Sequence, residues 1–344
     1  MKNKRILIVE VNWLGDVLFS TAAIRELRAM HPQSYIGCLV HKRCQEVLAG
    51  NPHINELIIL DEDNIHRGLK GTLVLVRHLR ARHFDTVYLF HRSFTRALIC
   101  WLSAIPHRIG YATPKRRAFL TESITPPEGA IHRAAYYLYI VTRKMISDKE
   151  QLRCDFFIND SDTAFIRRLL EKENIHPHER IVVMHPAGNW PAKRWPKHYF
   201  AELADELMTR YHCAVIFTGT GKDCSLIGEI IVSMKQKAIN LCGGTSLKQL
   251  GALFERSDLL ISGDSGPLHV AVALARPAIA LFGPTDQSIT GPLATRNTAV
   301  LQKSVDCMIP CYMVDCVDNR CMAAIGVEDV LDCIEKNQWL RIEK

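Results

Sequence analysis

Residues 263–269, GDSGPLH, place an acid, a hydroxyl, two glycines and a histidine between an apolar run and a helix-like stretch. Ser265 and Gly266 would leave backbone amides free at the start of that helix, and His269 lies one turn further along. Amides at a helix N-terminus, together with a hydroxyl and an imidazole, are suited to bind a diphosphate. Asp264 would hold a ribose hydroxyl or orient a neighbouring amide. The alternative is a capping Asp-Ser pair, with His269 satisfied in the core.

A second polar segment, HPAGNWPAKRWPKHYF, starts at His185 and follows the apolar run IVVM. It holds two tryptophans and three prolines around the adjacent cations Lys193 and Arg194. Stiff aromatic residues can fix the positions of two cations, and paired cations bind phosphate. A solvated basic loop held by buried tryptophans is the alternative. The density of these residues favours a phosphate site.

The segment FTGTGKDCS contains Thr220 between two glycines, ahead of a helix-like stretch. Glycines and hydroxyls at a helix N-terminus form a concavity of amides that binds anions. The spacing is neither the G-x-G-x-x-G of dinucleotide-binding proteins nor the G-x-x-x-x-G-K-[ST] of P-loop proteins. The loop therefore indicates an anion without identifying it.

Near the N-terminus, VNWLGDVLFS follows the first apolar run and contains Asp16. Gly15 permits a tight bend in the backbone. Asp16 opens the following helix, where a carboxylate can cap exposed amides. As the alternative to capping, Asp16 would act as a general base, with Trp13 packed beside the reacting group.

Strand-like and helix-like segments alternate along both halves of the chain. Apolar runs such as RILIVEV, YIGCLVH, IVVMHPAG and AVIFTGT predict buried parallel strands, and the stretches between them predict helices. This alternation predicts an α/β fold with a parallel sheet in each half and helices on both faces of each sheet. In such sheets ligands bind outside the carboxyl ends of the strands, which is where the four polar segments lie.

From about Thr125 to Asp160 the pattern becomes helical and then charged, and after a further helix and linker the alternation restarts at Arg180. We therefore expect two Rossmann-like, doubly wound domains that face each other across a cleft. Their predicted ranges are 1–160 and 175–325. Residues 326–344 contain an amphipathic helix, GVEDVLDCIEKNQWL, that would pack back across the domains.

Composition excludes some classes of protein. Hydrophobic residues make up 48% of the 344 residues and charged residues 23%, as in soluble globular proteins. No apolar stretch approaches the roughly 20 residues of a membrane span, and no signal-peptide pattern is present, so we expect a cytoplasmic protein. The net charge of +7 fits anionic ligands or the inner membrane surface. Because the basic and aromatic residues lie in loops of an enzyme-like pattern, we expect no nucleic-acid partner.

The twelve cysteines are mostly scattered in apolar surroundings and are expected to be reduced. Four of them, Cys307, Cys311, Cys316 and Cys321, are spaced C-x₃-C-x₄-C-x₄-C. Structural zinc sites usually carry C-x₂₋₄-C pairs set apart by a longer loop, so the match is partial. These cysteines are predicted to be either reduced structural thiols or a structural metal site or thiol pair. We assign them no catalytic role.

Together, four segments resemble glycosyltransferase family 9, the ADP-heptose lipopolysaccharide heptosyltransferases, and are most similar to its heptosyltransferase II members. The segments are NWLGDVLFS, IPHRIGY, PAKRWP and GDSGPLHVAVALARPAIALFGPTD, and they span nearly the whole chain. The resemblance implies the GT-B fold, with the acceptor on the N-terminal domain and the nucleotide sugar on the C-terminal domain. It also implies inverting, metal-independent transfer of heptose from ADP-L-glycero-D-manno-heptose to heptose I of the lipopolysaccharide core, at the inner face of the cytoplasmic membrane.

The resemblance also implies roles for single residues. Asp16 matches the catalytic base of the family, and Lys193 matches its diphosphate-contacting lysine. The segment from Asp264 to His269 matches the motif that holds the nucleotide diphosphate and ribose, through Asp264, Ser265, Gly266 and His269. Arg194 and Thr220 are transferred with less support. No cofactor is required by this mechanism.

Other functions remain open at this point. A family-9 transferase with another nucleotide sugar or another acceptor, including a protein, would carry the same segments. A catalytically silent protein that binds a nucleotide or a glycan could use the same fold, although a lapsed enzyme could lose Asp16 or Lys193. A dinucleotide oxidoreductase should show G-x-G-x-x-G after its first strand, whereas this chain has EVNWLGD.

Overall fold

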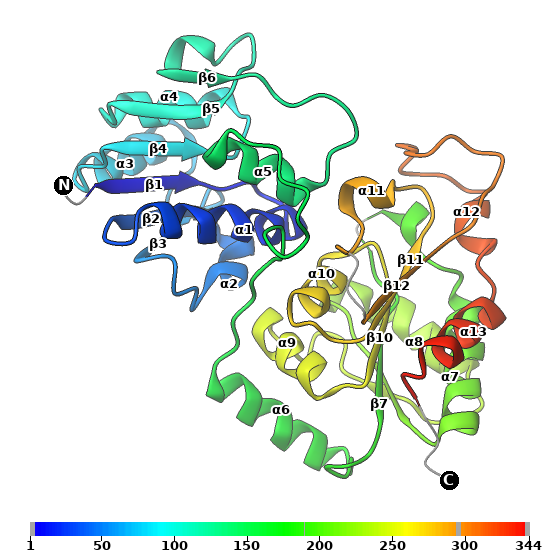
Figure 1. Cartoon of the computed structure of the whole chain (residues 1–344). Helices are drawn as coiled ribbons and strands as arrows, with labels where there is room; N and C mark the ends of the chain where they lie inside the picture. Colours follow the sequence, from blue (N-terminus) through cyan, green and yellow to red (C-terminus); the bar gives the residue numbers. More distant parts are fainter. Residues whose placement is uncertain (1–3, 189, 294–296, 341–344) are drawn as a thin grey trace. The chain divides into compact units, whose positions relative to one another are not determined.

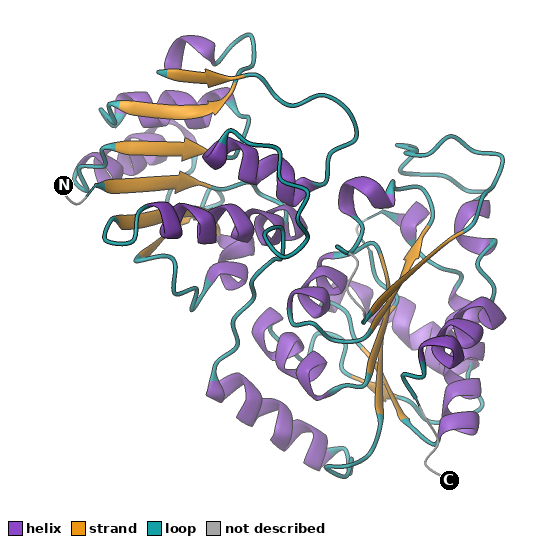
Figure 2. Ribbon diagram, in the orientation of Figure 1, coloured by secondary structure: helices purple, strands orange, loops and turns teal. Residues whose placement is uncertain are grey.

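Two parallel sheets of six strands each run through the residues that the structure describes, 4–188, 190–293 and 297–340. The structure is a computed structural model. The chain divides into two units, Met1–Phe157 and Ile158–Lys344, and each unit contains one sheet. Helices cover both faces of each sheet (Figures 1 and 2). The predicted α/β fold of two doubly wound, Rossmann-like units is therefore confirmed.

The sheet of the first unit has the strand order β3-β2-β1-β4-β5-β6. Every neighbouring pair is parallel. Its strands are β1 (Arg5–Val9), β2 (Tyr35–His41), β3 (Glu56–Leu60), β4 (Thr86–Leu89), β5 (His107–Tyr111) and β6 (Glu122–Ile124). The order reverses between β1 and β4, which is the place where doubly wound sheets bind their ligands.

Helices of the first unit pack on both faces of its sheet. They are α1 (Leu14–Met30), α2 (Gln45–Leu48), α3 (Gly68–Arg80), α4 (Phe94–Leu102) and α5 (Arg133–Thr142). Leu75 of α3 and Ala97 of α4 share a core cluster with Leu7 and Val87 of the sheet. Neighbouring strand residues point to opposite faces, and Ile6 is buried as well. The central strands are thus covered on both sides, which explains their continuous apolar runs.

The second unit repeats this topology. Its strands are β7 (Ile181–His185), β8 (Ala214–Phe217), β9 (Ile239–Asn240), β10 (Leu259–Gly263), β11 (Ala278–Phe282) and β12 (Thr298–Gln302). Their order in the sheet is β9-β8-β7-β10-β11-β12. Numbered from β7 as the first strand, this is 3-2-1-4-5-6, the same order as in the first sheet. The reversal therefore lies between β7 and β10.

The helices of the second unit begin with the segment that follows the boundary at residue 157. They are α6 (Asp160–Lys172), α7 (Lys197–Tyr211), α8 (Cys224–Ser233), α9 (Leu247–Arg256), α10 (Gly266–Ala273), α11 (Gln287–Thr290), α12 (Arg320–Ala323) and α13 (Val327–Asn337). Val330 and Ile334 of α13 join the same core cluster as Leu207 of α7. The predicted C-terminal helix thus forms and packs in its own unit. Residues 341–344 of the predicted range lie outside the described part.

Two strands were not expected from the sequence, β6 and β12. Both are edge strands, and both are short or only half-buried. In the region where helical segments were expected after residue 125, α5 ends at Thr142, and Arg143 adopts a left-handed conformation with φ of 59°. None of the helices among the described residues is long and apolar enough to cross a lipid bilayer.

Candidate active site

The predicted site residues follow the carboxyl ends of parallel strands, and all but Thr220 follow strands that flank the two topological switch points. Asp16 follows β1 in the first unit. In the second unit, Lys193 follows β7, and Asp264 follows β10 directly. Because parallel strands end at the same edge of a sheet, residues that are 71 positions apart in sequence meet there.

Asp16 lies in the first turn of α1 and is partly exposed. Its Oδ1 accepts a hydrogen bond of 3.0 Å from the hydroxyl of Tyr137, and Nε of Arg133 lies 3.8 Å from the same oxygen. Tyr137 is buried, and burial raises its pKa well above the usual value, so it remains a donor. The N-cap of α1 is Trp13 rather than Asp16. The Asp16 carboxylate is held by two side chains of α5, which fix its orientation.

Trp13 and Arg43 form a pair beside Asp16. The Arg43 guanidinium lies 4.7 Å from the centre of the Trp13 ring, and its Nε donates to the carbonyl oxygen of Asn12 at 2.7 Å. The indole is 59% exposed. Arg43 thus fixes one face of an exposed aromatic ring in the turn that leads to Asp16.

Glu10, at the end of the first strand-like run, is a buried acid that the sequence did not single out. Its carboxyl group accepts hydrogen bonds from the Ser20 hydroxyl at 2.9 Å and the Val11 amide at 3.3 Å. Burial raises its pKa to about 8, and the Asp16 charge acts in the same direction. Glu10 is therefore largely protonated at neutral pH. The signal in the sequence was an acid inside the apolar run RILIVEV.

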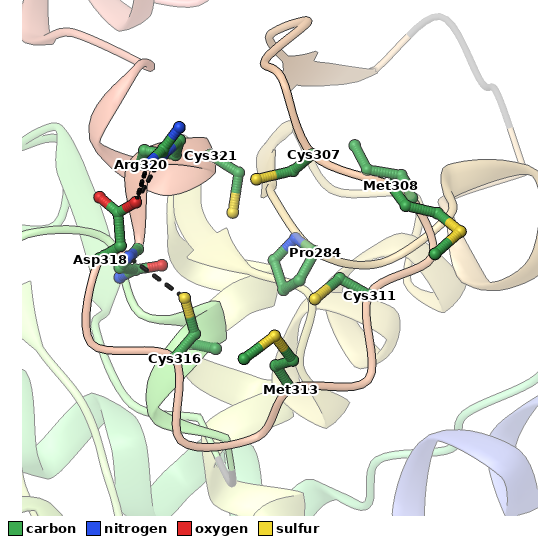
Figure 3. A pocket seen from close by; sticks show the side chains of 12 residues that line it. Pro284, Cys307, Met308, Cys311, Met313, Cys316, Asp318, Arg320 and Cys321 are labelled. Carbon is green, nitrogen blue, oxygen red and sulfur yellow. Dashed lines mark hydrogen bonds and ion pairs between the residues drawn. The ribbon is translucent and has the colours of Figure 1, made fainter.

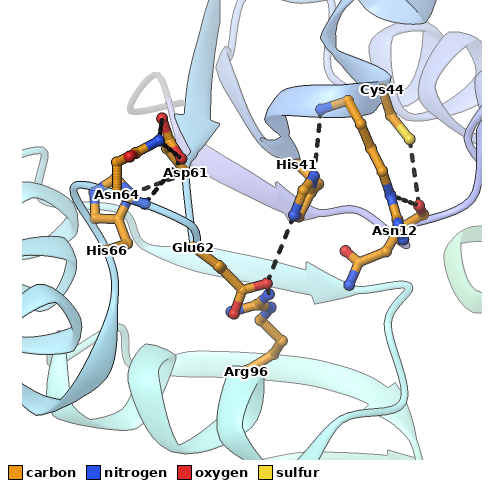
Figure 4. A network of polar contacts seen from close by, with 9 residues as sticks. Asn12, His41, Cys44, Asp61, Glu62, Asn64, His66 and Arg96 are labelled. Carbon is orange, nitrogen blue, oxygen red and sulfur yellow. Dashed lines mark hydrogen bonds and ion pairs between the residues drawn. The ribbon is translucent and has the colours of Figure 1, made fainter.

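A polar network extends across the neighbouring strand ends of the first unit (Figure 4). Arg96, which is buried, donates to Glu62 at 2.6 Å, and His41 lies 4.0 Å from the same carboxylate. Asp61 binds Lys42 at 3.0 Å. These contacts tie the ends of β2 and β3 to α4 and stiffen the edge that carries Asn12 and Asp16.

In the second unit, Lys193, Asp264 and His269 form one ionic cluster. Nζ of Lys193 lies 2.7 Å from Oδ2 of Asp264, and Nε2 of His269 lies 3.3 Å from Oδ1. Thr290 donates to Oδ2 at 3.4 Å. Burial alone would raise the pKa of Asp264, but His269 and Lys193 more than offset it and hold that pKa well below its usual value. Asp264 is therefore an ionised anchor that positions a lysine and a histidine.

The loop after β7 fixes the Lys193 side chain. Residues Pro191–Lys193 form a 3₁₀ turn, η3, and Nζ of Lys193 lies 4.7 Å from the centre of the Trp190 ring. Trp195 is buried and donates from its indole nitrogen to the Ile325 carbonyl at 2.7 Å. Trp195 thus anchors the loop in the core, and Trp190 lies against the Lys193 ammonium. The Arg194 guanidinium donates to the Gly188 carbonyl at 2.9 and 3.1 Å, which stabilises the loop, and its contact with a phosphate stays a prediction.

Ser265 and Gly266 begin α10, as the sequence predicted. Ser265 is the N-cap, and its hydroxyl accepts from the Leu268 amide at 3.4 Å and contacts the Ser262 hydroxyl at 2.9 Å. Gly266 is the first helical residue and brings its amide to the helix N-terminus. Asp264 directly precedes this N-cap and binds the Lys193 ammonium, so the lysine charge lies near the helix N-terminus and both could act on an anion.

Thr220 is the N-cap of the short 3₁₀ turn η4 (Gly221–Asp223). Its hydroxyl donates to the Asp223 carboxylate at 2.6 Å, and its amide donates to the same group at 2.9 Å. The hydroxyl is therefore engaged within its own turn. His185, which the sequence did not single out, is buried at the end of β7 and hydrogen-bonded to Thr218 at 3.1 Å. Burial lowers its pKa to about 4, so it is neutral and supports the strand ends.

Comparison with known proteins decides the family. The sequence model described as glycosyltransferase family 9 (heptosyltransferase) matches residues 72–318, which is more than half of the chain. The chain belongs to glycosyltransferase family 9. It is therefore a glycosyltransferase with the GT-B fold, which consists of two Rossmann-like units, as the resemblance implied.

Individual relatives of this glycosyltransferase agree. Lipopolysaccharide heptosyltransferase 2 of Escherichia coli K12 is 28% identical over 308 residues, covering 86% of this chain and 87% of the relative. Lipooligosaccharide heptosyltransferase 2 of Haemophilus influenzae Rd is 27% identical over 306 residues, covering 86% and 88%. Among solved structures, a family-9 glycosyltransferase from Veillonella parvula superposes with a TM-score of 0.88 at 25% identity over 97% of both chains. E. coli ADP-heptose lipopolysaccharide heptosyltransferase II superposes with a TM-score of 0.79 at 24% identity over 98% of both.

The four clustered cysteines of this glycosyltransferase line one small pocket next to Pro284 (Figure 3). All four are free thiols, and the Sγ of Cys316 accepts a hydrogen bond from the Asn319 amide at 3.5 Å. Across the described ranges, no three His, Cys, Asp or Glu side chains are arranged to hold a metal ion. Around the four cysteines the loop exposes Met308, Tyr312 and Met313.

Proposed function

We propose that this glycosyltransferase moves a heptose from ADP-L-glycero-D-manno-heptose to heptose I of the lipopolysaccharide inner core, with inversion at the anomeric carbon. The observation that carries the proposal is the similarity, over 86% of the chain, to proteins named heptosyltransferase 2. A solved structure with nearly full coverage is titled an ADP-heptose lipopolysaccharide heptosyltransferase. Because the acceptor is lipid-linked, the enzyme would act as a peripheral protein at the cytoplasmic face of the inner membrane.

Asp16 is proposed as the general base. It would take the proton of the acceptor hydroxyl while the hydroxyl oxygen attacks the anomeric carbon of heptose. The bond from that carbon to the β-phosphate oxygen breaks on the opposite side, so the configuration inverts. The partly exposed carboxylate held by Tyr137 and Arg133 supports this role, since a base must be both accessible and oriented.

The second unit is proposed to bind the ADP moiety. Lys193 gives one of its three donors to Asp264, which leaves two for the diphosphate. As ADP departs it gains negative charge, which the lysine and the α10 amides would stabilise without a metal ion. Asp264 and His269 would act by holding Lys193 and the α10 entrance in place.

The testing experiment is a transfer assay with ADP-L-glycero-D-manno-heptose and a heptose-I-bearing Kdo-lipid A acceptor. Asp16→Asn should lower kcat by about 10²–10⁴-fold, because a positioned base contributes a factor of that size. Its affinity for ADP should stay near that of the wild type. Asp63→Asn, at an exposed acid of the same unit, is the matched control and should transfer normally.

Other outcomes separate the parts of the proposal. A wild-type protein that binds ADP but transfers nothing would contradict the sugar or the acceptor. A protein that does not bind ADP would contradict the donor, and other nucleotide diphosphates would be screened next. Equal activity of Asp16→Asn and the wild type would remove Asp16 as the base.

A further inference from the structure

One face of the first unit exposes apolar side chains that its core does not use. This face consists of α3, α4 and the 3₁₀ turn η2 (Arg117–Phe119), with α4 in contact with both of the others (Figure 1). On α3, Leu69 is 86% exposed, and Leu73 projects one turn later from the same side. Other residues of the helix, including Leu75 and Leu79, pack into the core. The exposed leucines therefore do not contribute to the core of the unit.

An aromatic cluster continues this face on α4. Phe94, Trp101 and Leu102 are spaced i, i+7 and i+8, and all three are exposed. The ring of Phe119 lies 5.4 Å from that of Phe94 and 5.7 Å from that of Trp101. Large apolar side chains gathered on neighbouring helices of a protein surface mark an interaction site.

The same part of the chain carries its basic excess. Residues 64–121 contain eleven Lys and Arg but a single acid, Asp85, which gives them a net charge of +10. The whole chain carries +7, so the remaining residues together carry −3. The positive charge is therefore concentrated in the segment that forms the apolar face.

Much of this charge is not neutralised inside the protein. Arg82 and Arg96 pair with Glu56 and Glu62. Six other cations on α3, η2 and the adjoining turns are exposed, and within the described ranges none forms an ion pair. These six are Arg67, Lys70, Arg77, Arg80, Lys115 and Arg117. Cations without a carboxylate partner, in the same segment as exposed leucines and a tryptophan, fit a partner that is both anionic and apolar.

We propose that this α3–α4 surface docks on a bilayer that contains anionic phospholipid. Its cations would approach the headgroups, while Leu69, Leu73, Trp101 and Leu102 would enter the boundary with the acyl chains. A nucleic acid would satisfy the charge but leave the three leucines exposed. The proposal rests on the proposed function, because a lipid-linked acceptor is what brings the enzyme to a bilayer.

Sedimentation of the full chain with vesicles tests the surface without any transfer reaction. Wild-type protein should bind phosphatidylcholine vesicles containing phosphatidylglycerol and should bind pure phosphatidylcholine vesicles far less. Lys70→Glu/Arg77→Glu should weaken binding about tenfold or more, since each cation near an anionic surface contributes roughly fivefold. Leu69→Ser/Leu73→Ser should also weaken it and should remove the part of the binding that survives high salt.

Matched controls come from the second unit. Val232 is as exposed as Leu69, at 86%, and Lys235 and Lys237 are two exposed lysines. Val232→Ser and Lys235→Glu/Lys237→Glu should bind vesicles like the wild type. All variants should transfer heptose normally to an acceptor dispersed in detergent, which separates docking from the transfer reaction.

Several results would overturn the proposal. These are wild-type protein that stays in the supernatant with anionic vesicles, or first-unit variants that bind as tightly as the controls. A third is a dimer in light scattering that Leu69→Ser/Leu73→Ser converts to a monomer, which would assign the surface to a second copy of the chain. Tight binding to a single-stranded oligonucleotide without vesicle binding would assign it to nucleic acid. A failed transfer assay with intact vesicle binding would contradict the proposed function alone.

Discussion

At the scale of single residues, the carboxylates of this glycosyltransferase occupy opposite electrostatic environments. Asp264 is buried but surrounded by Lys193 and His269, which keep it ionised. Glu10 is buried among neutral donors, and no ion pair to it is found in the described residues, so it keeps its proton. The same chemical group thus serves once as a charged anchor and once as a neutral hydrogen-bonding group.

Removing the Asp264 charge should destabilise the second unit. Asp264→Asn leaves the largely buried Lys193 ammonium unpaired, and breaking a buried pair costs about 3 kcal/mol. Urea unfolding of the full chain at neutral pH, followed by tryptophan fluorescence, measures the loss. Glu229→Gln, which breaks an exposed pair with Lys197 at 2.8 Å, should cost less than about 1 kcal/mol. Equal losses in free energy of unfolding for the two variants would show that the buried pair contributes no more to stability than the exposed pair.

Glu10 predicts a pH dependence of stability. Its folded pKa of about 8 lies above its unfolded value, so the folded state holds a proton that the unfolded state releases. The free energy of unfolding should therefore fall as pH rises from about 5 to 8, by at most about 1.4 kcal/mol per pH unit from this group. Glu10→Gln should remove that slope and be more stable than the wild type at pH 8.

The pH experiment compares urea midpoints across this range. Glu128→Gln, at an exposed glutamate of the same unit, should keep the wild-type slope. An unchanged slope in Glu10→Gln would mean that the buried carboxyl group is ionised at neutral pH.

At the scale of elements, a glycine at the end of β10 allows the 3₁₀ turn η3 to pack close to that strand. A Cβ at Gly263 would lie 3.0 Å from the Lys193 carbonyl oxygen, a tight contact that the backbone could accept only by shifting a few tenths of an ångström. Gly263 therefore sets how near the lysine loop comes to Asp264.

Gly263→Ala should push η3 away and raise the KM for the donor several-fold, while the KM for the acceptor stays unchanged. Gly228→Ala in α8 is the control, because its Cβ would meet no atom within 4 Å. It should leave both KM values unchanged and stabilise the helix by up to about 1 kcal/mol. A donor KM unaffected by Gly263→Ala would separate the loop position from donor binding.

The elements also show how far sequence reasoning reaches. β2 was predicted with its observed bounds, because a parallel strand buried on both faces reads as a continuous apolar run. β6 and β12 were missed because edge strands bury too little to produce that signal. The meeting of Lys193, Asp264 and His269 was predictable from strand ends alone. Tyr137 was not, since its contact with Asp16 spans 121 residues and depends on the packing of α5 against α1.

Arg194 shows a second limit of the sequence. Its contact with a phosphate stays a prediction, and the structure adds a bond from its guanidinium to the Gly188 carbonyl that the sequence did not indicate. A sequence reveals that a cation is present near a site but not which acceptor reaches it first. Which acceptor a long side chain binds depends on the conformation of its loop, and that conformation depends on tertiary contacts.

At the scale of the whole molecule, the proposed binding of ADP to the second unit predicts which unit ADP protects from hydrogen exchange. Hydrogen exchange of the full chain with and without ADP should show added protection greatest at residues 188–196 and 263–270 in the second unit. Lys193→Met should lose most of this protection while its exchange without ADP stays like that of the wild type. Protection confined to residues 10–20 of the first unit would contradict the donor assignment.

The loop that carries Cys307, Cys311 and Cys316 has a practical consequence. Met308 and Met313 stand exposed on it, so five sulfur atoms within ten residues meet solvent or a shallow pocket. Thioethers and thiols are the side chains that air and peroxide attack first, and access decides which of them react. Protein stored without a reducing agent should therefore become chemically heterogeneous at this loop while both sheets remain intact, and two preparations that fold alike could differ here in covalent state.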